Sequence, residues 1–160
     1  MASWSVKDFD VLAFDTSRIL SATMPKLGGI IESGLYVENL QRAALFYEQV
    51  LGLRQIAGDE RFVVYSVAER DVLLLFKRGG TTEPLHVPGG MLPPHDGSGQ
   101  NHMAFAVTAD ELDSWEERLA AHQIGIESRV DWPRGGSSLY FRDPDGNLLE
   151  LATPGIWSIY

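Results

Sequence analysis

The sequence predicts an α+β protein built from two tandem β-α-β-β-β modules. Patterned segments in residues 29–80 recur in the same order in residues 100–153, and a stretch rich in Gly and Pro, residues 81–99, separates the two runs. Self-similarity at a nearly fixed offset is typical of duplicated structural units. We therefore expect one curved eight-stranded sheet, with both helices on its outer face and a concave inner face.

The first module opens with a strand and a helix. Residues 30–37 (IIESGLYV) alternate between two faces, as a half-buried strand does. Residues 38–53 carry apolar side chains at helical spacing, with Asn39 as an N-cap and Gly52 as a stop. Three short apolar strands bounded by turn residues complete the module, in residues 53–58, 61–69 and 71–79.

The second module repeats this order. Residues 101–107 (NHMAFAV) read as a strand, and residues 108–124 as an amphipathic helix with Thr108 and Glu111 spaced as a capping box. Three further strands are expected in residues 126–132, 137–143 and 147–153. A tight turn, DPDG from Asp143 to Gly146, joins the last two. Residues 1–28 form an N-terminal extension and residues 154–160 a tail, both outside the repeat.

Composition excludes several classes of function. The 160 residues include 13 basic and 22 acidic side chains, for a net charge of −9, so nucleic acid is an unsuitable partner. No apolar run is long enough to span a membrane, and the N-terminus does not resemble an export signal. There is no cysteine, which fits a cytoplasmic protein and leaves His, Asp, Glu or water to hold any metal.

One carboxylate occupies an unexpected place. Glu150 lies within the otherwise aliphatic strand LLEL, where an ionised group without a partner is unfavourable. Glu32 and His102 open equivalent strands, 70 residues apart, and both fall on the face turned away from the helices. Their neighbours on that face are small residues, which leaves room for a ligand.

Two motifs carry a resemblance to a known family. Residues 37–53, with the pattern V-x-x-L-x-x-A-x-x-F-Y-x-x-V-L-G-L, resemble the first module of the vicinal-oxygen-chelate superfamily. Residues 140–151 (YFRDPDGNLLEL) resemble the end of its second module. The superfamily holds glyoxalase I, extradiol dioxygenases, fosfomycin-resistance thiol transferases and bleomycin-resistance proteins. The resemblance covers residues 29–153 and is specific for the fold rather than for one reaction.

The resemblance implies a metal site. Family members with a metal draw ligands from the first and last strands of each module, which places them here at Glu32, His102 and Glu150. The fourth equivalent position holds Leu74, and Glu32 stands where three-ligand relatives commonly carry His. Such a set would take one divalent ion, Fe²⁺, Mn²⁺, Zn²⁺ or Ni²⁺. The implied activity is a glyoxalase-like lyase or isomerase, or a dioxygenase, in which the ion chelates neighbouring oxygens of a small substrate and stabilises an enolate or oxyanion.

Further candidates surround this set. Tyr140 matches the tyrosine of the extradiol signature, but Asp131 stands where that signature expects a histidine. Tyr36, Arg134 and His95 are candidate substrate-binding residues: Tyr36 as an aromatic wall, Arg134 as a partner for an anionic group, and His95 as a group on the linker above the cup. The alternative is a metal-free binding protein of the bleomycin-resistance type. Because modules often pair between chains in this superfamily, we expect a homodimer.

Overall fold

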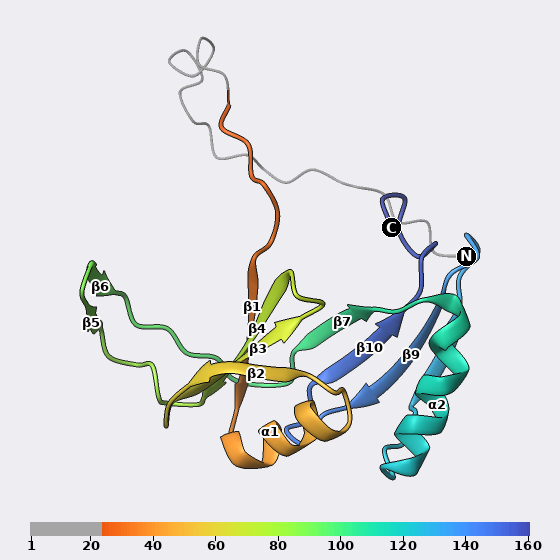
Figure 1. Ribbon diagram of the computed structural model, residues 1–160, viewed down its shortest axis with the longest axis horizontal. Coiled ribbons are helices and arrows are strands. Elements are labelled where there is room, and N and C mark those ends of the chain that lie inside the picture. The colour runs from red at the N-terminus through yellow and green to blue at the C-terminus, as the bar shows by residue number, and fades with distance from the viewer. Residues whose placement is uncertain (1–23) are drawn as a thin grey trace.

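The computed structural model describes residues 24–160 and contains the two expected modules (Figure 1). Most of the N-terminal extension, residues 1–23, lies outside the described residues. The first module consists of β1 (Glu32–Val37), α1 (Leu40–Gln49), β2 (Arg54–Gly58), β3 (Phe62–Val67) and β4 (Asp71–Lys77). The second consists of β7 (His102–Ala106), the 3₁₀ turn η2 (Ala109–Glu111), α2 (Leu112–Ala121), β8 (Ser128–Asp131), β9 (Ser137–Arg142) and β10 (Leu148–Ala152).

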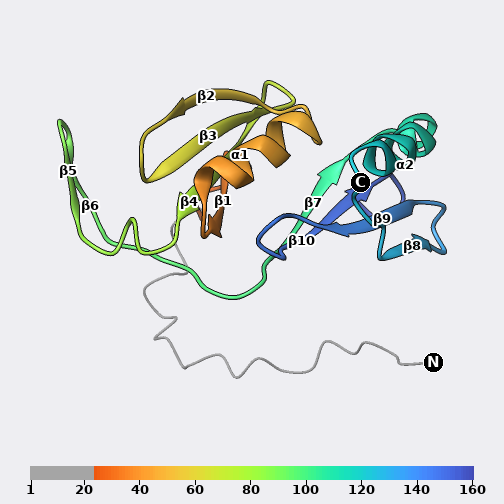
Figure 2. The ribbon, with the colours of Figure 1, turned by 90° about the horizontal axis from the view of Figure 1, so that it is seen from below.

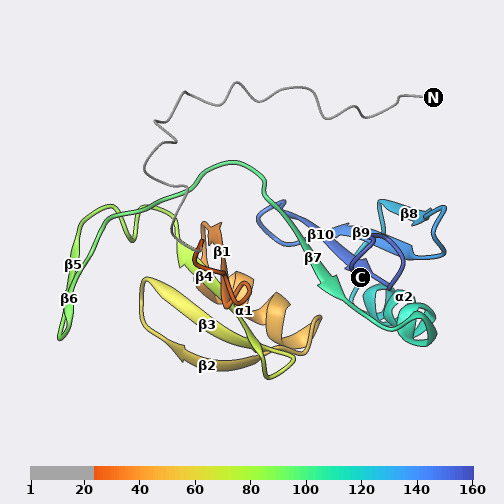
Figure 3. The ribbon, with the colours of Figure 1, turned by 90° about the horizontal axis from the view of Figure 1, so that it is seen from above.

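The strands form two separate four-stranded sheets, and this corrects the expectation of one sheet of eight. The orders are β1-β4-β3-β2 and β7-β10-β9-β8, with β1–β4 and β7–β10 parallel and the other pairs antiparallel. Within the described residues, β1 pairs only with β4 and β7 only with β10. Figures 2 and 3 show the two sheets as distinct units, each with its own helix. Within residues 24–160, the outer backbone edge of each sheet's first strand therefore has no strand partner.

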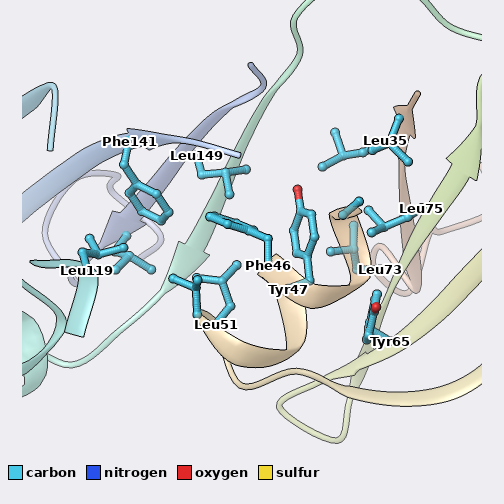
Figure 4. Packing of buried hydrophobic residues seen from close by; sticks show 14 of the residues in the cluster. Leu35, Phe46, Tyr47, Leu51, Tyr65, Leu73, Leu75, Leu119, Phe141 and Leu149 are labelled. Carbon is cyan, nitrogen blue, oxygen red and sulfur yellow. The ribbon is translucent and has the colours of Figure 1, made fainter. Parts of the chain in front are cut away.

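The two modules meet through α1 instead of through those strand edges. Phe46 on α1 lies against Tyr47 and, with ring centroids 6.5 Å apart, against Phe141 of the second sheet (Figure 4). Arg118 of α2 donates to the carbonyls of Gln49 and Val50 at the end of α1, at 2.7 and 2.5 Å. These contacts join both modules into one hydrophobic core. In residues 24–160 the modules are thus connected through α1 and not through a common ladder of β1 and β7.

The register of the sheets confirms the internal repeat. Gly34 on β1 pairs with Leu74 on β4, and the equivalent Ala104 on β7 pairs with Glu150 on β10. Glu150 therefore takes the place in the second module that Leu74 takes in the first. The same scaffold carries an apolar residue in one copy and a carboxylate in the other.

The helix starts differ from expectation in one case. The Asn39 side chain accepts a hydrogen bond from the Arg42 amide at 2.9 Å, which confirms the predicted N-cap, and Gly52 ends the segment with φ +70°. The predicted capping box is wrong, because Thr108 bonds the Glu111 side chain and makes no cap to a backbone amide. A 3₁₀ turn takes its place, and α2 begins only at Leu112.

The linker between the modules is not wholly irregular. It contains a two-stranded hairpin, β5 (Leu85–Val87) and β6 (Gly90–Leu92), which stands away from both sheets (Figure 1). Its later part, from His95 to Gly97, returns to the first sheet. No helix in residues 24–160 has the length and apolar character that crossing a membrane requires.

Candidate functional site

Glu150 lies at the centre of a hydrogen-bonded cluster on the inner face of the second sheet. Its side chain is buried, with 5% of the residue exposed. One carboxylate oxygen, Oε1, accepts the hydroxyls of Ser138 at 2.5 Å and Tyr140 at 3.0 Å, both from the neighbouring strand β9. Trp132 Nε1 in turn donates to Ser138 Oγ at 2.8 Å. Two donors thus fix Oε1 and leave Oε2 free to face the interior of the site.

His102 faces that second oxygen. Its Nε2 lies 3.2 Å from Glu150 Oε2, and its Nδ1 lies 3.1 Å from the carbonyl oxygen of Leu148. A carbonyl oxygen only accepts hydrogen bonds, so Nδ1 must carry a proton. Nε2 then meets Oε2 either as an N–H donor or as a lone pair with a cation between them. A histidine whose other nitrogen donates to a backbone carbonyl is the usual geometry of a metal-binding imidazole.

Tyr140 remains a neutral donor in this cluster. Burial and the hydrogen bond to Glu150 raise its pKa above the usual value, and the Ser138 hydroxyl opposes the shift. Its ring also lies against that of His102, with centroids 6.3 Å apart. The site therefore presents an imidazole, a carboxylate and a phenol from three adjacent strands.

Glu32 lies on the other sheet, at the start of β1, with an exposed side chain. Within residues 24–160 of one chain, no three His, Asp or Glu side chains come close enough together to hold a metal ion. Glu32 instead lines a mainly apolar cavity of about 580 Å³ between the modules, together with residues such as Phe105 and Trp115. That cavity includes neither His102 nor Glu150, so in one chain Glu32 and the His102–Glu150 cluster lie in two different places.

Two of the three candidate substrate-binding residues lie together. Tyr36 Oη and His95 Nδ1 are 2.6 Å apart, and the Thr81 hydroxyl donates to the His95 backbone carbonyl at 2.5 Å. Burial and the nearby Asp96 carboxylate raise the pKa of Tyr36. Arg134 lies apart from this pair, exposed on the turn between β8 and β9.

Sequence reasoning missed Ser138 and the role of Trp132 as a hydrogen-bond donor to it. Ser138 is fully buried, and it shares the strand face of Tyr140, two residues away. The alternation of strand faces could have predicted Ser138, because the short DPDG turn already placed Tyr140 beside Glu150 and residues two apart share a face. Trp132 had no such signal, since its position depends on the path of the Gly-rich loop before β9.

This architecture defines a class of protein: duplicated β-α-β-β-β modules, with a histidine and a carboxylate on the first and last strands of the second module. The model of the Glyoxalase/Bleomycin resistance protein/Dioxygenase superfamily matches residues 29–151, and the chain belongs to that superfamily. The resemblance drawn from the two sequence motifs is thereby confirmed.

Individual relatives agree with this assignment. The chain is 27% identical over 129 residues to metallothiol transferase FosB of Shouchella clausii, covering 79% of this chain and 81% of the relative. It is 27% identical over 130 residues to fosfomycin resistance protein FosX of Listeria monocytogenes, covering 78% and 89%. The crystal structure of lactoylglutathione lyase from Agrobacterium tumefaciens is similar with a TM-score of 0.76 at 31% identity, covering 84% of this chain and 99% of that one.

Proposed function

We propose that the protein is a metal-dependent enzyme that acts on a small substrate with two neighbouring oxygens. His102 and Glu150 supply two ligands to one divalent ion, and Glu32 supplies the third. When bound, the ion acts as a Lewis acid and a template that stabilises an enolate or oxyanion of the substrate. The names of the relatives, a metallothiol transferase and a lactoylglutathione lyase among them, support enzyme chemistry of this kind.

The observation that carries the proposal is the pairing of His102 Nε2 with Glu150 Oε2 at 3.2 Å. Hydrogen bonds to the other polar atom of each side chain fix its orientation. His102 Nδ1 donates to the Leu148 carbonyl oxygen, and two hydroxyls donate to Glu150 Oε1. Such support orients both ligands toward one point before any ion arrives. An ordinary surface ion pair needs no such support.

We propose that Glu32 joins the site from a second chain, so that the enzyme is a homodimer. Glu32 and His102 open equivalent strands, yet they lie on two sheets whose first-strand edges find no strand partner in the described part of one chain. Bringing β1 of one chain beside β7 of another would pair these edges and place Glu32 next to His102. The expected eight-stranded face would then form between two chains.

The remaining candidates take roles around the ion. Tyr140 is the acid–base residue: its hydroxyl donates to Glu150 Oε1 in the free site and would turn from there to a substrate oxygen when the substrate binds. Tyr36 and His95 form one end of the substrate-binding face. Arg134 pairs with an anionic group at the outer rim.

The test is elemental analysis of untagged protein beside a Glu150→Gln variant, after reconstitution with excess Fe²⁺, Mn²⁺, Zn²⁺ or Ni²⁺. The wild type is expected to retain about one equivalent of one divalent metal per chain, and the variant to lose it while keeping the circular dichroism spectrum of the folded protein. An exposed carboxylate outside the site, changed as Glu83→Gln, serves as the matched control. Full occupancy in the Glu150 variant would overturn the ligand set, and no metal in the wild type would favour the metal-free binding alternative.

A further inference from the structure

The central row of the first sheet's inner face is apolar where the equivalent row of the second sheet is polar. In the second sheet, Ala104, Glu150 and Tyr140 are paired across β7, β10 and β9 and form one row. The equivalent row of the first sheet is Gly34, Leu74 and Val64. The duplication thus keeps the scaffold and replaces a carboxylate–phenol pair by two aliphatic side chains.

This apolar row is not part of the core. Leu74 and Val64 are partly exposed, whereas their strand neighbours Leu73, Leu75 and Val63 are buried beneath α1. Neighbouring apolar side chains that stay half exposed gain free energy when another apolar surface covers them. We call this surface the apolar face, consisting of Phe62, Val64, Val72, Leu74 and Phe76.

The apolar face ends at an aromatic wall. Phe76 stacks on Tyr36, with centroids 5.5 Å apart, and meets the edge of His95 at 4.7 Å. Because the Tyr36 hydroxyl already bonds His95, its polar atom is occupied and the ring is what it presents to the face. The linker residue Gly97 packs directly on the Tyr36 ring, since a Cβ there would lie 2.3 Å from it. The linker therefore closes the face at the end away from Glu32.

The opposite end leads to the metal ligands. Glu32 lies on the same strand face as Gly34 and Tyr36, so the apolar face begins next to a proposed ligand and runs away from it. A substrate held at the ion by two oxygens would extend either over the polar second sheet or over this face. The row of Glu32 continues through Val72 to Ser66 and Arg54, so the polar groups of this face lie at the metal end and the apolar residues lie beyond it. This order favours an apolar body that points away from the ion.

From this geometry we infer that the substrate is amphipathic: a chelating head with two neighbouring oxygens, joined to an apolar body about the size of a phenyl ring or larger. The inference rests on the proposed function, because the head is placed by the metal. Leu74 and Val64 contact the body, and the Tyr36–His95 wall limits its length.

The test uses two hydroxamates, which chelate through two oxygens and differ only in the body. Acetohydroxamate has a methyl group and benzohydroxamate a phenyl ring. Their dissociation constants are measured by calorimetry on the full chain reconstituted with Zn²⁺. Benzohydroxamate is expected to bind at least about tenfold more tightly, the scale that burial of several apolar carbons gives.

Variants locate the effect. Leu74→Ala, and Val64→Thr as a change that keeps side-chain shape, are expected to reduce the ratio of the two constants toward one while leaving acetohydroxamate binding unchanged. Leu45→Ala, an exposed leucine on α1 at 56% exposure, is the matched control and should keep the full ratio.

The two failures are distinguishable. Equal binding of both hydroxamates by the wild type, or a ratio that persists in both apolar-face variants, would overturn the amphipathic substrate while leaving the metal site intact. Binding of neither hydroxamate to the Zn²⁺-loaded chain would overturn the proposed function, and this inference with it.

Discussion

At the scale of single residues, the distinctive feature is that two hydroxyls bond the same oxygen of the Glu150 carboxylate and leave the other oxygen free. Ser138 and Tyr140 both bond Oε1, so Oε2 is the oxygen that faces His102. Ser138 is itself oriented by Trp132, which donates to its oxygen and leaves its hydrogen for Glu150. A buried carboxylate held in this way has little freedom to rotate, and its free oxygen is directed at one point.

Ser138→Ala is therefore expected to weaken metal binding by about tenfold or more, because Glu150 loses one of its two orienting donors. The free energy of unfolding should fall by about 1–3 kcal/mol, since Trp132 Nε1 also loses its acceptor. Isothermal titration with the metal and urea unfolding measure the two effects. Ser137→Ala is the control, because that hydroxyl bonds the exposed Asp131. Metal affinity equal in both variants would show that Ser138 does not position Glu150.

The sequence alone identified Glu150 and one of its donors, Tyr140, but not Ser138 or the role of Trp132. An isolated carboxylate among three leucines is visible in one dimension, and its cost in an apolar strand is a general rule. The contribution of Trp132 depends on a loop conformation, and side-chain contacts across a loop have no periodic signature. Ser138 lay between these cases, since strand parity alone could have placed it beside Glu150.

At the scale of elements, the turn from Asp143 to Gly146 joins the two modules as well as two strands. Asp143 is buried, and its carboxylate accepts the amides of Asp145 and Asn147, the Asn147 side chain and the Tyr47 hydroxyl of α1. The expected turn is confirmed, with Gly146 at φ +81°. Its link to α1 was invisible in the sequence, because 96 residues separate Tyr47 from Asp143.

Asp143→Ala should lower the free energy of unfolding by about 3 kcal/mol, because several buried donors lose their acceptor at once. Chemical denaturation monitored by tryptophan fluorescence gives the value. Asp110→Ala, an exposed aspartate in the turn before α2, should change stability by less than about 1 kcal/mol. A similar small loss in both variants would contradict the role assigned to the turn.

Tyr47 predicts a pH dependence of stability. Burial raises its pKa far above the ordinary tyrosine value of 10.0, and the neighbouring Asp143 raises it further. The unfolded chain releases this proton near pH 10, whereas the folded chain keeps it, so the unfolded state binds fewer protons and stability falls as pH rises above 10. One such group contributes a slope of about 1.4 kcal/mol per pH unit.

Tyr47→Phe removes that proton from both states. At pH 8 its free energy of unfolding should be lower than that of the wild type, because the variant lacks the hydrogen bond to Asp143. Between about pH 10 and 11.5 the free energy of unfolding of the variant should decline less steeply with pH than that of the wild type, and the two slopes should differ by the contribution of one proton. Denaturation curves at a series of pH values measure this, and parallel curves for the two proteins would refute it.

At the scale of the whole molecule, the order of elements was predictable and their assembly was not. Periodicity and turn residues place the strands and helices of both modules, since these signals are local. Whether two sheet edges pair is decided by long-range packing, here by Phe46 and Arg118, which attach α1 to the second module. Glu32 lies on the strand face turned away from α1, as its parity predicted, but no local signal says which residues of this or another chain face it.

Mixing a Glu32→Gln variant with a Glu150→Gln variant tests whether Glu32 joins His102 and Glu150 of another chain. If each site combines Glu32 of one chain with His102 and Glu150 of another, a dimer of one Glu32→Gln chain and one Glu150→Gln chain contains one site with both changes and one native site. Random exchange of subunits makes about half of all dimers mixed, so about one quarter of the sites should recover metal binding. Each variant alone should bind none.

Metal content after co-refolding the two variants in equal amounts provides the measurement, with each variant refolded alone as the control. Recovery near one quarter means that the unpaired edges of β1 and β7 meet between chains and complete the inner face there. No recovery, with both variants still dimeric by light scattering, would mean that Glu32 and Glu150 act within one chain. The two sheets would then have to rotate about α1 to bring Glu32 to His102, breaking the hydrogen bonds of Arg118 to the end of that helix. The present packing of α1 argues against that rotation, because it would open the shared core to water.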